Sequence, residues 1–349
     1  MNKKTEGDSM SIIAFEKKIT LPKTMEEWRI RKEYLRSIVR DIFEENKIPY
    51  EENITFENGL FVDFYNKEHN LAVEVYDLAS HCSSKDILDF KKISDKQPYN
   101  NWKKANDLGI RLICAYENEI LDEKKYYVFR NMIQYQCGIF HRIYARNTKV
   151  EIIPALKMKP FYEANNIQGY RNAKTAFVLK DKKTNEPLMA YSIGNSFFGK
   201  GKYSCEIARG ACVINYHNTG IGIQIVAGAS KLWKHILEYG ETHNPDGTPG
   251  KIDTIVYYTD SRYYDGRSIG HLMDSGIEGG RVETLATTPG FMNFWDNVPE
   301  NPENRQGLMK NREASKHSFI MQGYRNGNIL CIPNAGTTTH VYIRDGVEL

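Results

Sequence analysis

Four residues in the first third of the chain have the types and order that phosphodiester chemistry uses. Asp63 and Glu74 each interrupt a mainly apolar stretch, and His81 and Lys103 follow them. A carboxylate inside an apolar strand is unfavourable unless it is paired or binds a cation. Two convergent carboxylates suit Mg²⁺, which is usually held by one or two of them together with substrate phosphate. A histidine that moves a proton and a lysine that offsets phosphate charge complete a set for phosphodiester hydrolysis.

Each of these residues also has an ordinary interpretation. Acidic side chains at strand edges are usually solvated, a single histidine is often a surface or core residue, and a single lysine is often part of a solvated helix face. The spacing leaves both interpretations open.

The surrounding pattern predicts an α/β unit. Residues 24–46 place apolar side chains near helical spacing after Thr24, and Glu27 completes a capping box. Two short apolar stretches, 60–65 and 71–76, flank a polar turn and predict a β-hairpin that brings Asp63 and Glu74 together. A polar helix within 84–108 ends near Gly109 and precedes an apolar strand over 110–116.

Two segments of this unit, VDFYNKEHNLAVEVYDLASH and YNNWKKANDLGIRLICAYENEI, carry a resemblance. They resemble the nuclease domain of phage homing endonucleases related to very-short-patch-repair enzymes, within the wider PD-(D/E)XK restriction-endonuclease-like fold. The resemblance implies Mg²⁺-dependent cleavage of double-stranded DNA. The residues in matching places are Asp63, Glu74, His81, Lys103, Glu117 and Glu119. The chain departs from the family pattern at Phe61, Tyr76 and Asn100.

A different pattern begins after residues 147–160, which contain two prolines and predict a joining segment. With 349 residues the chain is long enough for two domains. We expect a loose arm over 1–22, a first domain over 23–150 and a second over 155–349. In the second we expect a hairpin over 176–193, strands near 203–213, 220–226 and 251–259, helices over 229–238 and 268–274, and more strands within 318–343.

Two features of the second half suggest ligand contacts. The small-residue turn at 227–230 lets backbone N–H groups approach an anion at a helix N-terminus, although tight packing explains it equally well. Asp260 is followed by arginines interleaved with tyrosines, which contact phosphates and stack on bases in nucleic-acid-binding proteins. Tyrosine and arginine are also common on plain surfaces.

The segments PFYEANNIQG, EIARGACV, AGASKL and YTDSR, in this order, resemble the C-terminal domain of the same phage endonucleases, which is similar to GNAT acyltransferases and to phage Mom DNA-modification proteins. The resemblance implies a mixed-sheet GNAT-like domain for DNA recognition. Asn166 replaces the histidine of the family motif. The residues carried over for DNA or ligand binding are Asn166, Arg209, Ser230, Lys231, Tyr258, Asp260 and Arg262.

Composition and charge narrow the class of protein. The net charge is only +3, so bulk charge does not indicate nucleic-acid binding, although a local basic stripe would suffice. No apolar run reaches the ~20 residues of a membrane span, and six scattered cysteines without a CxxC pair favour a reducing compartment. We expect a homing endonuclease in the cytoplasm of an infected bacterial host, acting as a nickase or as a homodimer. The alternatives are an acyl-CoA-dependent DNA base-modifying acyltransferase and a catalytically decayed DNA-binding protein.

Overall fold

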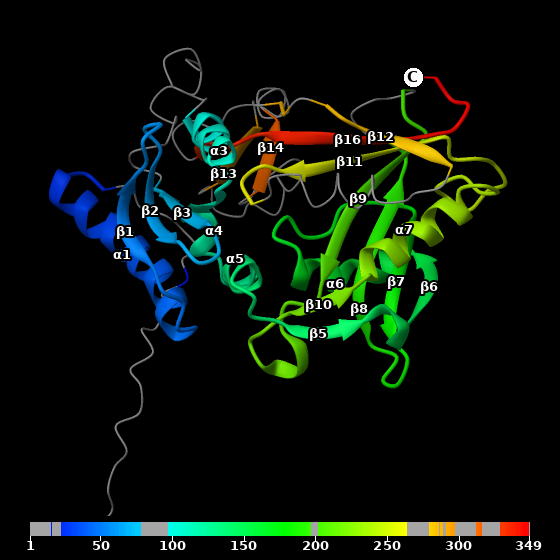
Figure 1. Cartoon of the computed structure of the whole chain (residues 1–349), viewed down its shortest axis with the longest axis horizontal. Coiled ribbons are helices and arrows are strands. Elements are labelled where there is room, and N and C mark those ends of the chain that lie inside the picture. Colours follow the sequence, from blue (N-terminus) through cyan, green and yellow to red (C-terminus); the bar gives the residue numbers. More distant parts are fainter. Residues whose placement is uncertain are drawn as a thin grey trace, which may run out of the picture.

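A computed structural model describes Phe15 and residues 22–77, 97–196, 202–263, 279–285, 287–288, 291–296, 312–315 and 329–348. Helices and mixed sheets alternate along the described chain, so the predicted α/β class is confirmed. Figure 1 shows a smaller sheet at one end of the molecule and a larger sheet at the other.

The smaller sheet has four strands in the order β1-β2-β3-β4. Strand β2 pairs antiparallel with both β1 and β3, and β4 lies parallel to β3. The predicted hairpin is therefore confirmed, whereas β1 was not expected from the sequence. The elements are α1 (Met25–Glu45), β1 (Glu51–Thr55), β2 (Phe61–Asn66), β3 (Leu71–Tyr76), α3 (Gln97–Asp107), β4 (Arg111–Tyr116), α4 (Glu117–Ile120) and α5 (Glu123–Gln136).

Helix α1 begins where the sequence predicts. The Thr24 hydroxyl accepts a hydrogen bond from the Glu27 N–H at 3.1 Å, and the Glu27 carboxylate accepts one from the Lys23 N–H at 2.7 Å. The bond to Thr24 satisfies a backbone donor that the first helical turn leaves unpaired, and the bond from Lys23 fixes the residue before the cap. The buried face of the helix carries Leu35, Ile38, Val39, Ile42 and Phe43.

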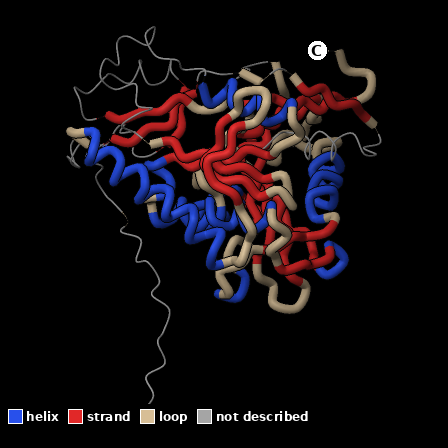
Figure 2. The backbone as a smooth tube through the Cα atoms, turned by 60° about the vertical axis from the view of Figure 1, so that its left-hand side comes forward, coloured by secondary structure: helices blue, strands red, loops and turns tan. Residues whose placement is uncertain are grey.

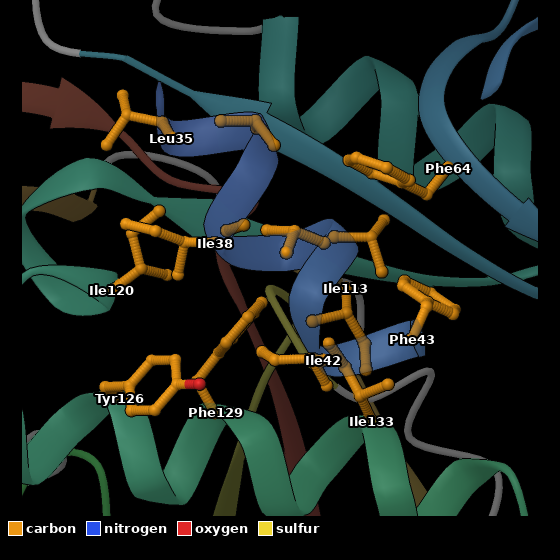
Figure 3. Packing of buried hydrophobic residues seen from close by; sticks show 14 of the residues in the cluster. Leu35, Ile38, Ile42, Phe43, Phe64, Ile113, Ile120, Tyr126, Phe129 and Ile133 are labelled. Atoms are coloured by element: carbon orange, nitrogen blue, oxygen red, sulfur yellow. The ribbon is translucent and has the colours of Figure 1, made fainter. Parts of the chain in front are cut away.

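This buried face lies between the smaller sheet and α5. Figure 3 shows Tyr126, Phe129 and Ile133 pointing from α5 toward α1. Phe64 of β2 and Ile113 of β4 close the core from the sheet side. Figure 2 shows α1 running along one side of the strands that fill the middle of the molecule. Burial of these apolar side chains stabilises the position of every strand around the candidate site.

The larger sheet has seven strands in the order β12-β16-β11-β9-β8-β7-β6. Strands β6 to β9 form an antiparallel meander, and β11 lies parallel to β9 after a crossover through α7. The segment 147–160, expected to join two domains, begins with β6, which is the edge strand of this sheet. The elements are β6 (Thr148–Pro154), β7 (Thr175–Asp181), β8 (Pro187–Gly194), β9 (Cys205–Cys212), α7 (Gly228–Tyr239), β11 (Thr254–Asp260), β12 (Gly280–Thr284) and β16 (Thr337–Arg344).

Helices cover both faces of this sheet. Helix α7 packs with Phe177 and Leu179 of β7 through Leu232, Trp233 and Ile236. Helix α6 (Lys159–Asn165) packs with Ala176 and Val178 of the same strand through Tyr162. Because successive strand residues point to opposite faces, α6 and α7 lie on opposite sides.

Two smaller sheets complete the described fold. Strands β5 (His141–Tyr144) and β10 (Ile223–Val226) pair in parallel, and β13 (Phe291–Asp296) pairs with β14 (Arg312–Ser315) and β15 (Ile329–Pro333). Short 3₁₀ turns lie at η2 (Ala145–Asn147), η3 (Ala155–Met158) and η4 (Tyr216–Asn218). The helix expected over 268–274 lies outside the described residues.

Candidate functional site

Asp63 is buried in β2, and both of its oxygens are bound within the protein. Its Oδ1 accepts a bond from Nη1 of Arg36 at 2.7 Å, and its Oδ2 accepts one from the Val75 N–H at 2.7 Å. Arg36 also reaches Glu52 at 2.7 Å and Asn53 at 2.8 Å. A buried carboxylate with a charged partner and a backbone donor is held in one position.

The ion pair of Asp63 belongs to a larger charge network between α1 and β1. Arg40 binds Glu52 at 2.8 Å and Glu33 at 2.9 Å. The bond from Arg40 and then that from Arg36 lower the pKa of Glu52, although partial burial opposes them. Glu52 therefore stays ionised at neutral pH and shares Arg36 with Asp63.

Glu74 is the second buried carboxylate, on the central strand β3. The side-chain amide of Asn101 in α3 donates to both of its oxygens at 2.9 and 3.0 Å, and the Tyr76 hydroxyl donates at 2.6 Å. Burial raises the pKa of Tyr76 well above its ordinary value, and the charge of Glu74 raises it further. Tyr76 consequently remains a donor toward Glu74.

Asp63 and Glu74 lie on neighbouring strands, as the hairpin predicts. The register pairs Phe64 with Val73, so the two acidic residues are the next positions along β2 and β3. Alternate residues of β3 pack in two separate clusters. Leu71, Val73 and Val75 belong to the cluster with α1, whereas Ala72 and Tyr76 belong to the cluster with α3. Asp63 is bound from the α1 side and Glu74 from the α3 side.

Lys103 lies on α3 and is exposed to solvent. It lines an open depression together with Gln97, Asn100, Asn101, Lys104 and Asp107. Asn101 thus both binds Glu74 and forms part of this depression. The arrangement places a buried carboxylate one side chain away from a surface that carries the exposed Lys103, while Lys104 beside it donates to the Gly59 carbonyl at 2.9 Å.

His81 lies outside the described residues, in the gap between β3 and α3. Sequence reasoning did not single out Arg36, Asn101 or Asp77. Asp77 is buried directly after β3 and accepts a bond from the Trp28 indole at 3.0 Å. One feature of the sequence could have indicated Arg36, because it is a charged residue beside Leu35 on the apolar face of α1. No feature of the sequence indicated Asn101.

The donor chemistry at this site fits Mg²⁺. The ion prefers carboxylate oxygens and keeps several waters, so one or two protein carboxylates suffice. Glu74 Oε2 already accepts two hydrogen bonds, from Tyr76 and Asn101, and Asp63 is ion-paired with Arg36, so a bound metal would replace part of these interactions. Within the described residues, no group of three or more His, Cys, Asp or Glu side chains converges to hold a metal. An ion held by both Asp63 and Glu74 would have to replace the bonds that Arg36 and Asn101 make to them from opposite sides of the sheet.

The second half gathers three of its predicted residues around the loop that follows α6. The Asn166 amide donates to the Gly210 carbonyl at 3.0 Å, the Gln168 amide donates to Asp260 at 3.2 Å, and Arg209 Nε donates to the Gly169 carbonyl at 2.9 Å. Strands β9 and β11 pair up to Ile207 and Tyr257 and not beyond. The hydrogen bonds of the loop 166–169 therefore link β9 and β11 in the region where the two strands no longer pair with each other.

Arg262 is fully buried rather than on the surface. Its guanidinium donates to Asp260 at 2.6 Å and to Glu119 at 2.9 Å. Tyr263 is buried beside it and also donates to Glu119. A ligand can reach Arg262 only by displacing these carboxylates.

The remaining predicted residues lie apart from that loop. Lys231 in α7 donates to the carbonyls of Ala145 at 3.0 Å and Thr148 at 2.5 Å, which ties the helix to the start of β6. Burial lowers the pKa of Lys231, and nearby Lys182 lowers it further. Ser230 is exposed in the first turn of α7, and burial raises the pKa of Tyr258 on β11 to about 12.

No protein-family model matches the chain, and no curated protein matches it in sequence. None of the helices in the described part of the chain has the length and apolar composition of a membrane span.

Proposed function

We propose that this chain is a metal-dependent endonuclease of double-stranded DNA. One observation carries the proposal, namely two buried carboxylates on the two strands of one hairpin, Asp63 and Glu74, each one position beyond the Phe64–Val73 pair. Glu74 is bound by Asn101, which lines the depression beside Lys103. Burying a carboxylate is costly, and a catalytic metal is one reason to retain it.

In this proposal Asp63 and Glu74 would hold Mg²⁺ in exchange for part of their present hydrogen bonds. The ion would lower the pKa of a bound water and neutralise phosphate charge. Tyr76 and Asn101 orient Glu74 through their hydrogen bonds, and Arg36 orients Asp63. Lys103 faces the phosphate, and His81 moves the proton of the attacking water or the leaving oxygen.

The test is cleavage of supercoiled plasmid and linear duplex by the full chain, with Mg²⁺ or with EDTA. Glu74→Gln and Asp63→Asn keep the side-chain shapes and should slow cutting by at least ~100-fold. Glu206→Gln is the matched control, because Glu206 is a buried carboxylate paired with Arg171 in the other sheet. Thermal unfolding of each variant distinguishes an effect on the chemistry from an effect on folding.

Cutting at the wild-type rate by Glu74→Gln, in a folded protein, would overturn the assignment. Intact DNA under all conditions, combined with salt-sensitive duplex binding, would instead favour the decayed DNA-binding protein.

The finer proposal is a site-specific homing endonuclease in the cytoplasm of an infected bacterial host. Its support is the resemblance together with the observed order of a helix, three antiparallel strands, a helix and a strand among the described elements of the first half. A restriction-endonuclease-like unit and a GNAT-like recognition unit are the domain identities that we propose. With one nuclease site per chain, a double-strand break requires a homodimer or two successive nicks.

A second candidate function is acyl-CoA-dependent modification of a DNA base. The observation that favours it is the loop from Asn166 to Gly169, which bonds to both Arg209 and Asp260 where β9 and β11 stop pairing. It predicts a mass increase of nucleosides that requires an acyl-CoA and survives Glu74→Gln. Unchanged nucleosides with every acyl donor would remove this candidate.

A further inference from the structure

The parallel ribbon of β5 and β10 has one buried face and one exposed face. Ile223 and Ile225 of β10 pack into the core of the larger sheet, and Ile143 of β5 packs against them. The alternate residues Arg142 and Tyr144 of β5 are exposed. Figure 1 shows this ribbon beneath α5, on the side of the larger sheet away from β11 and β16.

Aromatic and basic side chains alternate along the exposed face. The Tyr135 and Phe140 rings lie 5.1 Å apart, and the guanidinium of Arg142 lies 5.8 Å from the Phe140 ring centre. The guanidinium of Arg146 lies 5.0 Å from the ring centre of Tyr144, which is 44% exposed. The rings hold both arginines in place without neutralising them.

The chain segment that contains β5 is rich in basic residues, three of which lie beyond the ribbon on β6, η3 and α6. Residues 138–160 contain five Lys or Arg side chains and a single acidic one, Glu151. Glu151 is paired with Lys180 at 2.7 Å. At the end of β5, Lys182 donates to the Arg146 carbonyl at 2.8 Å, and the described bonds of Lys231 go to neutral oxygens of Ala145 and Thr148.

We propose that the exposed face of the β5–β10 ribbon binds the phosphate backbone of duplex DNA through Arg142 and Arg146. The partner that we infer is a polyanion, because Arg142 and Arg146 are both exposed and lie over aromatic rings, in a chain whose net charge is only +3. Phosphate contact is favoured over stacking on unpaired bases, because guanidinium groups already lie over the Phe140 and Tyr144 rings. A two-stranded ribbon is also narrow enough to follow a DNA groove.

This inference rests on the proposed function for its choice of DNA over other polyanions. It concerns binding, so it is tested in EDTA, where a metal-dependent nuclease does not cut. The probes are a fluorescein-labelled 30-base-pair duplex and the corresponding single strand, titrated with the full chain over a series of salt concentrations. Failure of the nuclease proposal leaves this experiment unaffected.

The test variant is the double substitution Arg142→Gln and Arg146→Gln. The matched control is Arg29→Gln with Arg281→Gln, two exposed arginines on α1 and β12 that lie in local pairs with Glu26 and Glu283. We expect the ribbon variant to bind the duplex at least ~10-fold more weakly. The slope of log K against log salt should fall by roughly 0.9 for each phosphate that the variant no longer neutralises. The control should bind like the wild type.

Unchanged binding by the ribbon variant, or an equal weakening in the control, would overturn the proposal. So would a wild-type protein that binds no duplex. Preferential binding of the single strand through the same two arginines would overturn the duplex assignment. Unchanged thermal unfolding of the ribbon variant is expected, because both side chains are on the surface.

Discussion

Arg262 and Glu119 form a buried ion pair at 2.9 Å across 143 residues of sequence. Glu119 lies in α4, directly after the smaller sheet, and Arg262 follows β11 of the larger sheet. The Arg262 carbonyl also accepts a bond from the Cys114 N–H of β4 at 2.9 Å. Tyr263 packs in the core beneath α1. The chain after β11 therefore packs against the smaller sheet.

Removing this pair should destabilise the whole protein. Arg262→Met leaves Glu119 and Asp260 without their shared cation, and breaking a buried pair typically costs about 3–5 kcal/mol. Arg281→Met, at an exposed pair with Glu283, should cost less than about 1 kcal/mol. Urea unfolding gives both free energies, and equal values would contradict a role for Arg262 as a buried link.

Lys103→Met should impair cleavage without affecting stability, because the side chain is exposed on α3. Loss of one group that stabilises transition-state charge costs on the order of 10²-fold in rate. The matched control is Lys234→Met on α7, an exposed lysine paired with Glu238. Single-turnover cleavage rates and thermal unfolding are measured for both. A Lys103→Met protein that cuts at full rate would exclude Lys103 from the site.

His340 should make stability depend on pH. Its ring is buried between the hydroxyls of Thr259 at 3.1 Å and Thr284 at 3.0 Å, and burial lowers its pKa. The unfolded chain then takes up the proton first, so this contribution is complete above a pH of about 6.5 and is lost as pH falls from there through the folded-state pKa.

The check is urea unfolding of wild type and His340→Gln between about pH 7.5 and pH 5. The difference in free energy of unfolding should shrink toward low pH. A constant difference would mean that His340 is not held neutral in the fold.

Gly210 lies where the structure leaves no room for a larger side chain. A Cβ at this position would lie 2.6 Å from Cε1 of Tyr191, its partner across the β8–β9 ladder. Gly210→Ala should therefore destabilise by about 1–3 kcal/mol, the usual cost of overpacking. Adding Tyr191→Leu makes room, so the double variant should be destabilised by less than the sum of the two single variants. Thermal unfolding of the three variants tests this, and strict additivity would count against the clash.

Local patterns in the sequence determined much of the fold. The cap at Thr24, the hairpin of β2 and β3, and helix α7 are predicted correctly, because capping, alternation and helical spacing act over a few residues. The two mainly apolar stretches predict Asp63 and Glu74 as acidic residues within buried strands, which the structure bears out.

Tertiary structure alone decided what those carboxylates contact. The partner of Asp63 is Arg36 of α1, and the partner of Glu74 is Asn101 of α3, neither marked by spacing. It also turned Arg262, expected to contact a ligand, into a buried link to Glu119. A side chain's burial and charge partner depend on which distant elements pack over it, and no local pattern of residues encodes that packing.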